Sequence, residues 1–238
     1  MHLQTTNWGL VLDLKGGKIH SLHHKEEKVL GTYNRIDGKG GNTHLCLPNF
    51  GNEGSELGLP FHGPARNVLW SVKQKRRYSI VISCDISQTP AYPADLHVEQ
   101  SFTLQDAFVH EVKVINTGKK AVPLNIGCHY YWNTPQGWNK IKINGEDVSE
   151  KIGVNGSQTL LKENTFQFPH TSYRITQTGF SDVVLWTGFI VKENKKKFDE
   201  GYCCIEPVRG GESFFGSPES LLSPGEEVST SFQIDQIV

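Results

Sequence analysis

Several features are missing from this 238-residue sequence, and each absence excludes a class of protein. No apolar run approaches the roughly 20 residues that a membrane-spanning helix needs. The formal net charge is only −1, which is not typical of a protein that binds nucleic acid or a membrane surface. The N-terminus, Met1 to Gln4, lacks a basic segment followed by an apolar one. We therefore expect a cytoplasmic protein, a monomer or weak dimer, with no nucleic-acid or membrane partner.

The cysteines also lack a recognisable pattern. There are five of them, an odd number, and none forms a C-x-x-C pair, which argues against a disulfide framework and a zinc knuckle. Cys203 and Cys204 are adjacent, but adjacent cysteines form only a strained bridge. We read all five as reduced. His20, His23 and His24 have no clear metal-ligand partner, so we expect no metal.

Helical periodicity is the last feature that is missing. No long segment places apolar residues at i, i+3, i+4 and i+7, whereas alternation with a period of two recurs between clusters of Gly, Pro, Asn and Asp. Asp95 to Asn116 predicts a hairpin that turns at Gln105 to Ala107. No composition shift marks a linker, and Asn194 to Lys197 reads as a charged surface turn. The pattern predicts an all-β fold, with residues 1–238 as one domain.

The densest candidate region is the Gly- and Pro-rich stretch from Pro48 to Trp70. Glycine and proline break regular structure there, so we expect a loop that holds His62 and Arg66. A lone histidine is more often structural or simply exposed than functional. The setting H-G-P-A-R makes His62 a candidate.

His129 is the second candidate and lies in the segment C-H-Y-Y-W-N. Alternation places Val122, Leu124, Ile126 and Cys128 on one face and His129 on the other. Aromatic faces beside a polar group suit the mixed apolar and hydroxylated surface of a sugar ring. A packed aromatic cluster that includes a histidine explains the segment equally well.

Glu206 is the third candidate, inside the apolar run Y-C-C-I-E-P-V and directly before a proline that we expect to end the strand. A carboxylate is costly to bury without a partner, so it either lies at a strand end in solvent or serves a site. In a sugar pocket such an acid can act as a general base.

Taken in order, these segments resemble the aldose 1-epimerase (galactose mutarotase-like) superfamily, most closely its hexose-6-phosphate mutarotase branch. G-G-N-T-H-L-C-L-P-N-F-G and L-P-F-H-G-P-A-R-N-V-L-W look like that branch's R-G-G-x-P-x-x-x-P-x-F-G and L-P-x-H-G-F-A-R-x-x-x-W. C-H-Y-Y-W-N, G-F-S-D-V-V-L-W-T-G, G-Y-C-C-I-E-P-V and L-L-S-P-G-E-E-V-S-T resemble its later segments. The resemblance covers nearly the full chain.

This resemblance implies a β-supersandwich of large antiparallel sheets with a polar pocket, and a sugar ring that opens and closes without a cofactor. Glu206 corresponds to the general base and His129 to the general acid. His62 is expected to hydrogen-bond near the ring oxygen. These roles require an ionised Glu206 and a protonated His129.

The resemblance also suggests a phosphorylated aldohexose. The two arginines that clamp phosphate in that branch correspond to Lys39 and Arg66, and lysine keeps the charge but loses the planar fork of arginine. Asp182 and Trp132 complete the expected substrate-binding residues. Pro64 and the pair Thr187-Gly188 depart from the family pattern.

Other functions stay open at this stage. An epimerase of unphosphorylated hexoses is one alternative, and a non-catalytic carbohydrate-binding domain on the same fold is another. Retention of His62, His129 and Glu206 argues against a binding domain, which needs no acid and base. Glycoside hydrolysis needs two carboxylates, and only Glu206 stands out.

Overall fold

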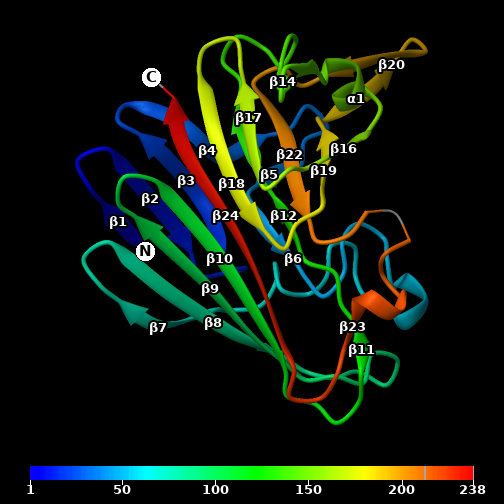
Figure 1. Cartoon of the computed structure of the whole chain (residues 1–238). Helices are drawn as coiled ribbons and strands as arrows, with labels where there is room; N and C mark the ends of the chain where they lie inside the picture. The colour runs from blue at the N-terminus through cyan, green and yellow to red at the C-terminus, as the bar shows by residue number, and fades with distance from the viewer. Residues whose placement is uncertain (212, 238) are drawn as a thin grey trace.

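The computed structural model describes residues 1–211 and 213–237 and is built almost entirely of strands (Figure 1). Over these residues the only helices are α1 (Ser149–Gly153) and the short 3₁₀ turns η1 (Ser55–Leu57) and η2 (Pro218–Ser220). No helix in this part of the chain has the length and apolar character needed to cross a bilayer. The all-β prediction is confirmed.

The strands form two large sheets, and all of their pairings are antiparallel. The 11-stranded sheet has the central order β1-β2-β3-β4-β13-β22-β12-β6, with β5 paired to β4, β19 to β22 and β16 to β19. Its strands are β1 (His2–Gln4), β2 (Trp8–Asp13), β3 (Lys18–His24), β4 (Glu27–Asn34), β5 (Gly40–Asn42), β6 (His44–Cys46), β12 (Gly127–His129), β13 (Tyr131–Asn133), β16 (Ser157–Thr159), β19 (Asp182–Trp186) and β22 (Tyr202–Val208).

The nine-stranded sheet has the order β15-β14-β17-β18-β24-β10-β9-β8-β7, and Figure 1 shows the red β24 between the yellow β18 and the green β10. Its strands are β7 (Ser71–Lys75), β8 (Ser79–Ile86), β9 (Leu96–Leu104), β10 (Phe108–Asn116), β14 (Lys142–Ile143), β15 (Glu146–Asp147), β17 (Glu163–Gln167), β18 (Ser172–Thr178) and β24 (Glu227–Ile237). Two small two-stranded sheets remain, β11 (Val122–Pro123) with β23 (Leu221–Leu222) and β20 (Phe189–Lys192) with β21 (Lys195–Phe198).

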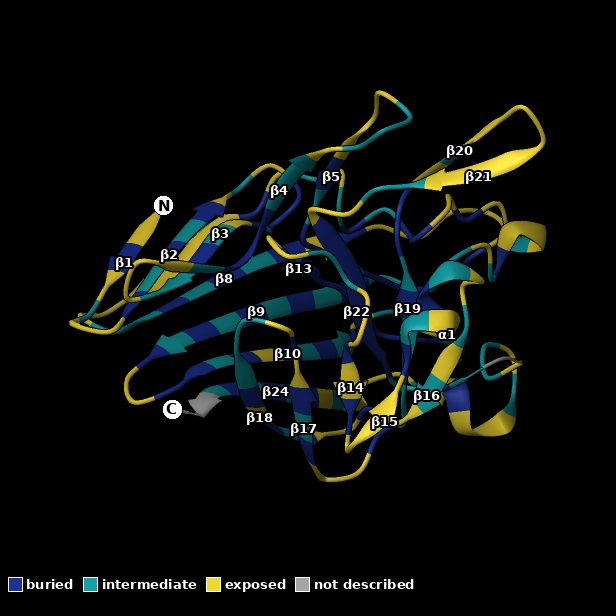
Figure 2. Cartoon of the chain, turned by 90° about the horizontal axis from the view of Figure 1, so that it is seen from above, coloured by how far each residue is buried: buried dark blue, intermediate teal, exposed yellow. Residues whose placement is uncertain are grey.

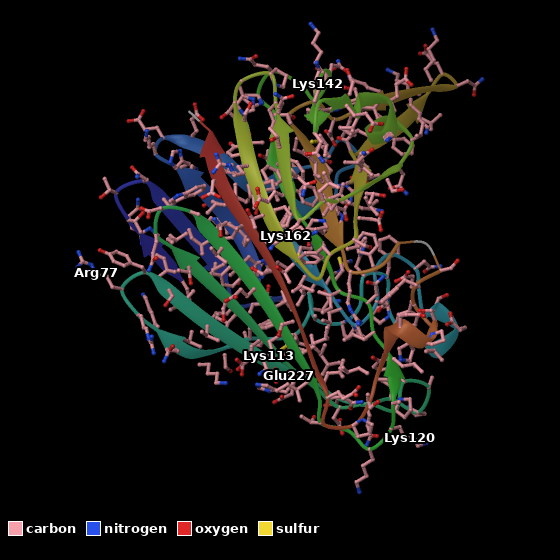
Figure 3. All side chains as sticks on the ribbon, in the orientation of Figure 1. Arg77, Lys113, Lys120, Lys142, Lys162 and Glu227 are labelled. Carbon is pink, nitrogen blue, oxygen red and sulfur yellow. The ribbon has the colours of Figure 1, made fainter. Side chains whose placement is uncertain are left out.

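The core lies between the sheets because each strand directs every second side chain inward. β9 and β10 form the predicted hairpin, with Leu104 paired to Phe108, and their buried positions alternate with partly exposed ones. Outward positions carry charge: Lys113 and Glu227 form a 2.5 Å ion pair, and Arg77 extends away from the molecule (Figure 3). The five cysteines are buried and reduced, as expected.

Two local expectations need correction. β22 does not end at Pro207 but continues to Val208, which pairs with Asp182 and Gly127, and the strand is buried along its length (Figure 2). Pro207 pairs with Val183 of β19, but on the other side of β22 the pairings with β13 and β12 reach only Cys204 and Val208. Proline is tolerated in this gap because its missing N–H donor is not needed there. The exposed turn expected at Asn194 to Lys197 is confined to Glu193 and Asn194, and the following lysines belong to β21.

Candidate active site

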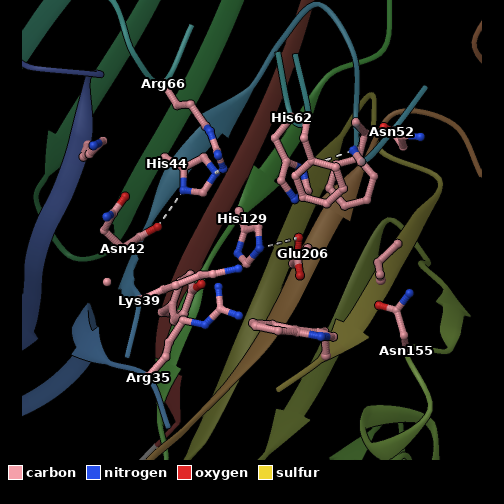
Figure 4. Close-up of a pocket in the computed structure, with 18 of the residues that line it drawn as sticks. Arg35, Lys39, Asn42, His44, Asn52, His62, Arg66, His129, Asn155 and Glu206 are labelled. Carbon is pink, nitrogen blue, oxygen red and sulfur yellow. Dashed lines mark hydrogen bonds and ion pairs between the residues drawn. The ribbon is translucent and has the colours of Figure 1, made fainter. Parts of the chain in front are cut away.

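A cavity of about 810 Å³ opens on the face of the 11-stranded sheet that points away from the core (Figure 4). Its walls come from β3, β5, β6, β12, β13, β19, β20 and β22, from the β4–β5 loop, from the long loop between β6 and β7, and from the segment after α1. Four cationic side chains line it against one carboxylate, that of Glu206. The cations are Lys18, Arg35, Lys39 and Arg66. This charge balance favours an anionic ligand.

His129 and Glu206 meet at the floor of the cavity. Alternation turns Cys128 into the core and His129 to the opposite face, and in β22 it turns Ile205 inward and Glu206 outward. Nε2 of His129 lies 3.5 Å from Oε2 of Glu206, and the two residues are only 6% and 2% exposed. Residues from distant parts of the chain thus form an acid and base pair.

Burial sets the protonation of this pair. It raises the pKa of the Glu206 carboxyl well above its ordinary 4.5. It also lowers the pKa of His129 well below 6.5, with help from His44, His62, Arg66 and Arg35. Burial therefore favours a neutral pair, not the ion pair that the roles implied by the resemblance require. Both forms hold one shared proton in total, so they differ only in which residue carries it.

Two atoms of this pair lack hydrogen-bond partners. Nδ1 of His129 and Oε2 of Glu206 are buried and make no hydrogen bond over the described residues. The Glu206 oxygen approaches only Nε2 of His129, at 3.5 Å. Buried polar atoms in folded proteins are nearly always paired, and exceptions cluster at functional sites. A ligand rich in hydroxyl groups suits these unpaired atoms.

His62 reaches the pair from the long loop, which contains η1 and matches the loop expected from Pro48 to Trp70. The Gly51 N–H donates to Nδ1 of His62 at 3.0 Å, so Nδ1 is an acceptor and the neutral ring carries its proton on Nε2. Burial lowers the pKa of His62 to about 3, which keeps the ring neutral. Gly63 fixes the loop, because a Cβ there would lie 2.0 Å from the Leu47 carbonyl oxygen.

His44 is a cavity-lining residue that sequence reasoning did not single out. Its Nδ1–H donates to the Asn42 carbonyl at 2.6 Å, so its Nε2 is free to accept from Nη1 of Arg66 at 3.1 Å. Its ring stacks on His129 with centroids 4.9 Å apart. Burial lowers the pKa of His44 to about 3, so the ring stays a neutral acceptor that orients Arg66.

Aromatic side chains complete the walls. Tyr131 stacks on His129 at 4.9 Å, and the Trp186 ring meets the same histidine edge-on at 5.9 Å. Phe50 and Phe61 pack edge-on against His62. Flat apolar surfaces beside polar groups are typical of sugar-binding pockets.

The structure brings together five of the seven residues expected from the sequence. Glu206, His129, His62, Arg66 and Lys39 all line this cavity.

The other two lie elsewhere. Trp132 is 1% exposed and points into the core, where it stacks on Phe168 and donates to the Ile205 carbonyl. Its neighbour Tyr131 takes the pocket face, because alternation from His129 reaches Tyr131 and not Trp132. Asp182 lies on the pocket side of β19, outside the lining, where it accepts hydrogen bonds from Thr159 and Ser181.

Some of the cavity residues that sequence reasoning missed carry a signal in the sequence, and others do not. Alternation could have identified Tyr131 from His129, and Trp186 from its place in the apolar run. His44 stands inside the motif that carried the resemblance. Nothing in the sequence marks Arg35, because its place in the cavity depends on how the loop after β4 folds.

Three potential metal-ligand atoms lie close together at the cavity floor. Cys204, His129 and Glu206 each offer one ligand atom, and the three atoms lie within 4.8 Å of one another. Zinc accepts such a donor set. The four cationic side chains around the same cavity oppose a divalent cation, so we assign no metal to this site.

Comparison with known proteins gives one family match. A family model described as aldose 1-epimerase matches residues 28–162, more than half of the chain. No curated protein sequence matches the chain.

Solved structures share the fold at low sequence identity. A galactose mutarotase related enzyme from Lactobacillus acidophilus is 15% identical with a TM-score of 0.77, over 100% of this chain and 97% of that one. A galactose mutarotase-like protein from Lactobacillus casei is 15% identical with a TM-score of 0.74, over 100% and 99%. One from Clostridium acetobutylicum is 16% identical with a TM-score of 0.65, over 99% and 94%.

Proposed function

The chain belongs to the aldose 1-epimerase family, and from that premise we propose that it interconverts the α and β anomers of an aldohexose 6-phosphate without a cofactor. Family and fold support a sugar epimerase of the mutarotase type. The observation that carries the proposal is the buried pair of His129 and Glu206, 3.5 Å apart, in a cavity with an excess of cationic side chains.

In the proposed reaction, Glu206 removes the proton of the anomeric hydroxyl while His129 protonates the ring oxygen. The bond between C1 and the ring oxygen breaks, C1 becomes the carbonyl carbon of the open-chain aldehyde, and no net charge is created. Rotation about the C1–C2 bond presents the other carbonyl face. Return of both protons closes the opposite anomer. Nε2–H of His62 is a donor suited to the region of the ring oxygen.

The neutral form of the pair that burial favours is compatible with these roles. Transfer of one proton from the Glu206 carboxyl to Nε2 of His129 converts the neutral pair into a base and an acid. The distance between the two atoms is 3.5 Å, so small side-chain movements bring them within proton-transfer reach.

The cationic side chains support a phosphorylated substrate. Arg66 is held by His44, and Lys39 projects into the cavity on the side of Arg35 in Figure 4. A phosphate dianion bound between Arg66 and Lys39 would offset the repulsion between these two cations and accept charge-assisted hydrogen bonds from both. A free hexose offers no such compensation.

The test is the rate of anomerisation of freshly dissolved α-glucose 6-phosphate, compared with α-glucose and α-galactose, by exchange NMR. We expect acceleration of the phosphosugar above the free sugars, and Glu206→Gln to lower kcat by about 10²- to 10⁴-fold. Glu53→Gln, which changes a partly buried glutamate outside the catalytic pair, is the control.

The alternatives give different results. Equal acceleration of free hexoses indicates an epimerase of unphosphorylated sugars. Sugar binding without acceleration indicates a carbohydrate-binding domain. An active Glu206→Gln variant removes Glu206 from the role of base.

For the chain as a whole, we propose one domain over residues 1–238, located in the cytoplasm as a monomer or weak dimer. In support of one domain, a single core cluster contains residues of both large sheets.

A further inference from the structure

The loop that joins β4 to β5 is a compact turn with a cation at each end. The Arg35 N–H donates to the Lys39 carbonyl at 3.0 Å, and the Gly38 N–H donates back to the Arg35 carbonyl at 2.9 Å. Asp37 fixes the turn from inside by accepting from the Lys39 N–H at 3.1 Å. Arg35 and Lys39 therefore enter the cavity from one rigid unit, which we call the cationic turn (residues 35–39).

The guanidinium of Arg35 is fixed on two sides. It donates to Asp37 at 2.6 Å and lies over the Trp186 ring, 4.7 Å from its centroid. Its Nε is buried and has no hydrogen-bond partner over the described residues. In Figure 4 the side chain points from the loop toward His129. A guanidinium that is held on two sides and lines the cavity is suited to an anionic group of a ligand.

Asp199 anchors the cationic turn from a distant part of the chain. Its carboxylate accepts from the Ile36 N–H at 3.2 and 3.0 Å and from the Tyr202 hydroxyl at 2.8 Å. The Asp199 N–H in turn donates to the Gly188 carbonyl at 2.7 Å. The connection between β21 and β22 thus fixes the position of the cationic turn relative to the sheet.

This anchor gives a physical reason for Thr187-Gly188, the pair that departs from the family pattern. A Cβ on Gly188 would lie 2.3 Å from Oδ2 of Asp199 and 2.4 Å from the Tyr202 hydroxyl, so any other residue displaces the anchor. The Thr187 hydroxyl donates to the Asp199 carbonyl at 3.2 Å and the Tyr202 carbonyl at 3.0 Å.

We infer that Arg35 binds the anionic group of the substrate and determines selectivity for the phosphosugar, and that Asp199 is the positioning residue that holds Arg35 in place. The inference rests on the proposed function and extends it. Lys39, where the related branch has an arginine, supplies charge without a planar fork. Arg35 supplies the planar fork from the other end of the same turn.

The experiment measures binding and turnover separately. Affinity for inorganic phosphate and for glucose 6-phosphate is measured by calorimetry, and the ratio of kcat/KM for glucose 6-phosphate to that for glucose is measured by exchange NMR. We expect Arg35→Gln to weaken phosphate binding and to lower the ratio, each by about 10-fold or more, since it removes a charge-assisted hydrogen bond. Arg35→Lys is expected to restore part of the loss.

Asp199→Ala is expected to change both quantities in the same direction as Arg35→Gln. Asp199→Asn, which keeps one acceptor oxygen for the Ile36 N–H, is expected to restore most of the loss. The double variant of Arg35→Gln and Asp199→Ala is expected to lose less than the sum of the two single changes, because both act on one group. Arg77→Gln, an exposed arginine on the hairpin of β7 and β8, is the control for a changed charge.

The outcomes separate this inference from the proposed function. If no sugar is turned over but phosphate binding depends on Arg35 and Asp199, the inference stands and the proposed reaction fails. If Arg35→Gln binds phosphate as tightly as the parent protein, the inference is overturned whatever the turnover. If Asp199→Asn loses as much phosphate affinity and selectivity as Asp199→Ala, Asp199 is not the positioning residue.

Discussion

His44 and Arg66 are joined by a hydrogen bond whose direction is set by a backbone carbonyl. Because the His44 Nδ1–H donates to Asn42, its Nε2 can only accept, and it accepts from the Arg66 guanidinium at 3.1 Å. A neutral histidine that accepts from the guanidinium orients Arg66 without reducing its charge. The pocket thus prepares each of its arginines with a dedicated partner, His44 for Arg66 and Asp37 for Arg35.

His44→Phe tests this partnership. The ring still stacks on His129, but Arg66 loses its acceptor, and a hydrogen bond to a charged group contributes about 1.5–3 kcal/mol. We expect KM for glucose 6-phosphate to rise by roughly 10-fold with a smaller change in kcat. Steady-state kinetics measure both, and His44→Gln, which keeps an acceptor, is the matched control. A lower kcat at unchanged KM would place His44 in the chemical step instead.

The pH profile tests the shared proton of His129 and Glu206. The pair is active with one proton. Because the pKa of His129 is lowered, the pair takes up a second proton only well below pH 6.5. Because the pKa of Glu206 is raised, the pair loses its single proton only well above pH 4.5. We expect kcat/KM to be level between these limits and to fall on both sides. Because a phosphate monoester itself loses its second proton at about pH 6, the profile is measured with glucose. An acid limb centred near pH 6.5 in exchange NMR with glucose would contradict the shared-proton description.

Acid should destabilise the fold through buried histidines. Burial lowers the pKa of His44, His62 and His110 to about 3, from an ordinary 6.5 in the unfolded chain. Above pH 6.5 they are neutral in both states, and as the pH falls toward 3 only the unfolded chain gains protons. The free energy of unfolding then falls by about 1.4 kcal/mol per pH unit for each histidine.

Urea unfolding at several pH values between 7 and 4 measures this slope. His110 lies in the core, where it contacts the Tyr130 hydroxyl at 2.7 Å and Gln100 at 3.1 Å, away from the candidate site. His110→Gln is expected to be less stable at pH 7 but to have a shallower dependence on pH, by one histidine. Equal slopes in the two proteins would show that His110 is not buried in its neutral form.

A matched pair of tryptophan variants tests the correction to the sugar-binding residues. Trp132→Phe leaves a void in the core and is expected to lower the free energy of unfolding by about 1–3 kcal/mol with KM unchanged. Trp186→Phe alters the pocket wall beside Arg35 and is expected to raise KM with little effect on stability. Unfolding curves and kinetics on both proteins provide the measurement. A raised KM in Trp132→Phe and an unchanged KM in Trp186→Phe would place Trp132, and not Trp186, in the site.

Much of the fold follows from local patterns. The hairpin of β9 and β10, the faces of Cys128 and His129, and the long loop around His62 were predicted from alternation and from Gly and Pro, because each pattern is read over a few neighbouring residues. The same rule, applied from His129, would have chosen Tyr131 over Trp132.

The sequence by itself determined that this chain is all-β, that His129 turns away from the core, and that Glu206 needs a reason to be buried. Only the tertiary structure decided that these two side chains lie side by side, that His44 accepts a hydrogen bond from Arg66, and that Asp199 accepts one from the cationic turn. The physical reason is the order of the strands. Side-chain direction depends on the period of a single strand, whereas the meeting of β12 with β22, or of Asp199 with Ile36, depends on which distant segments pair.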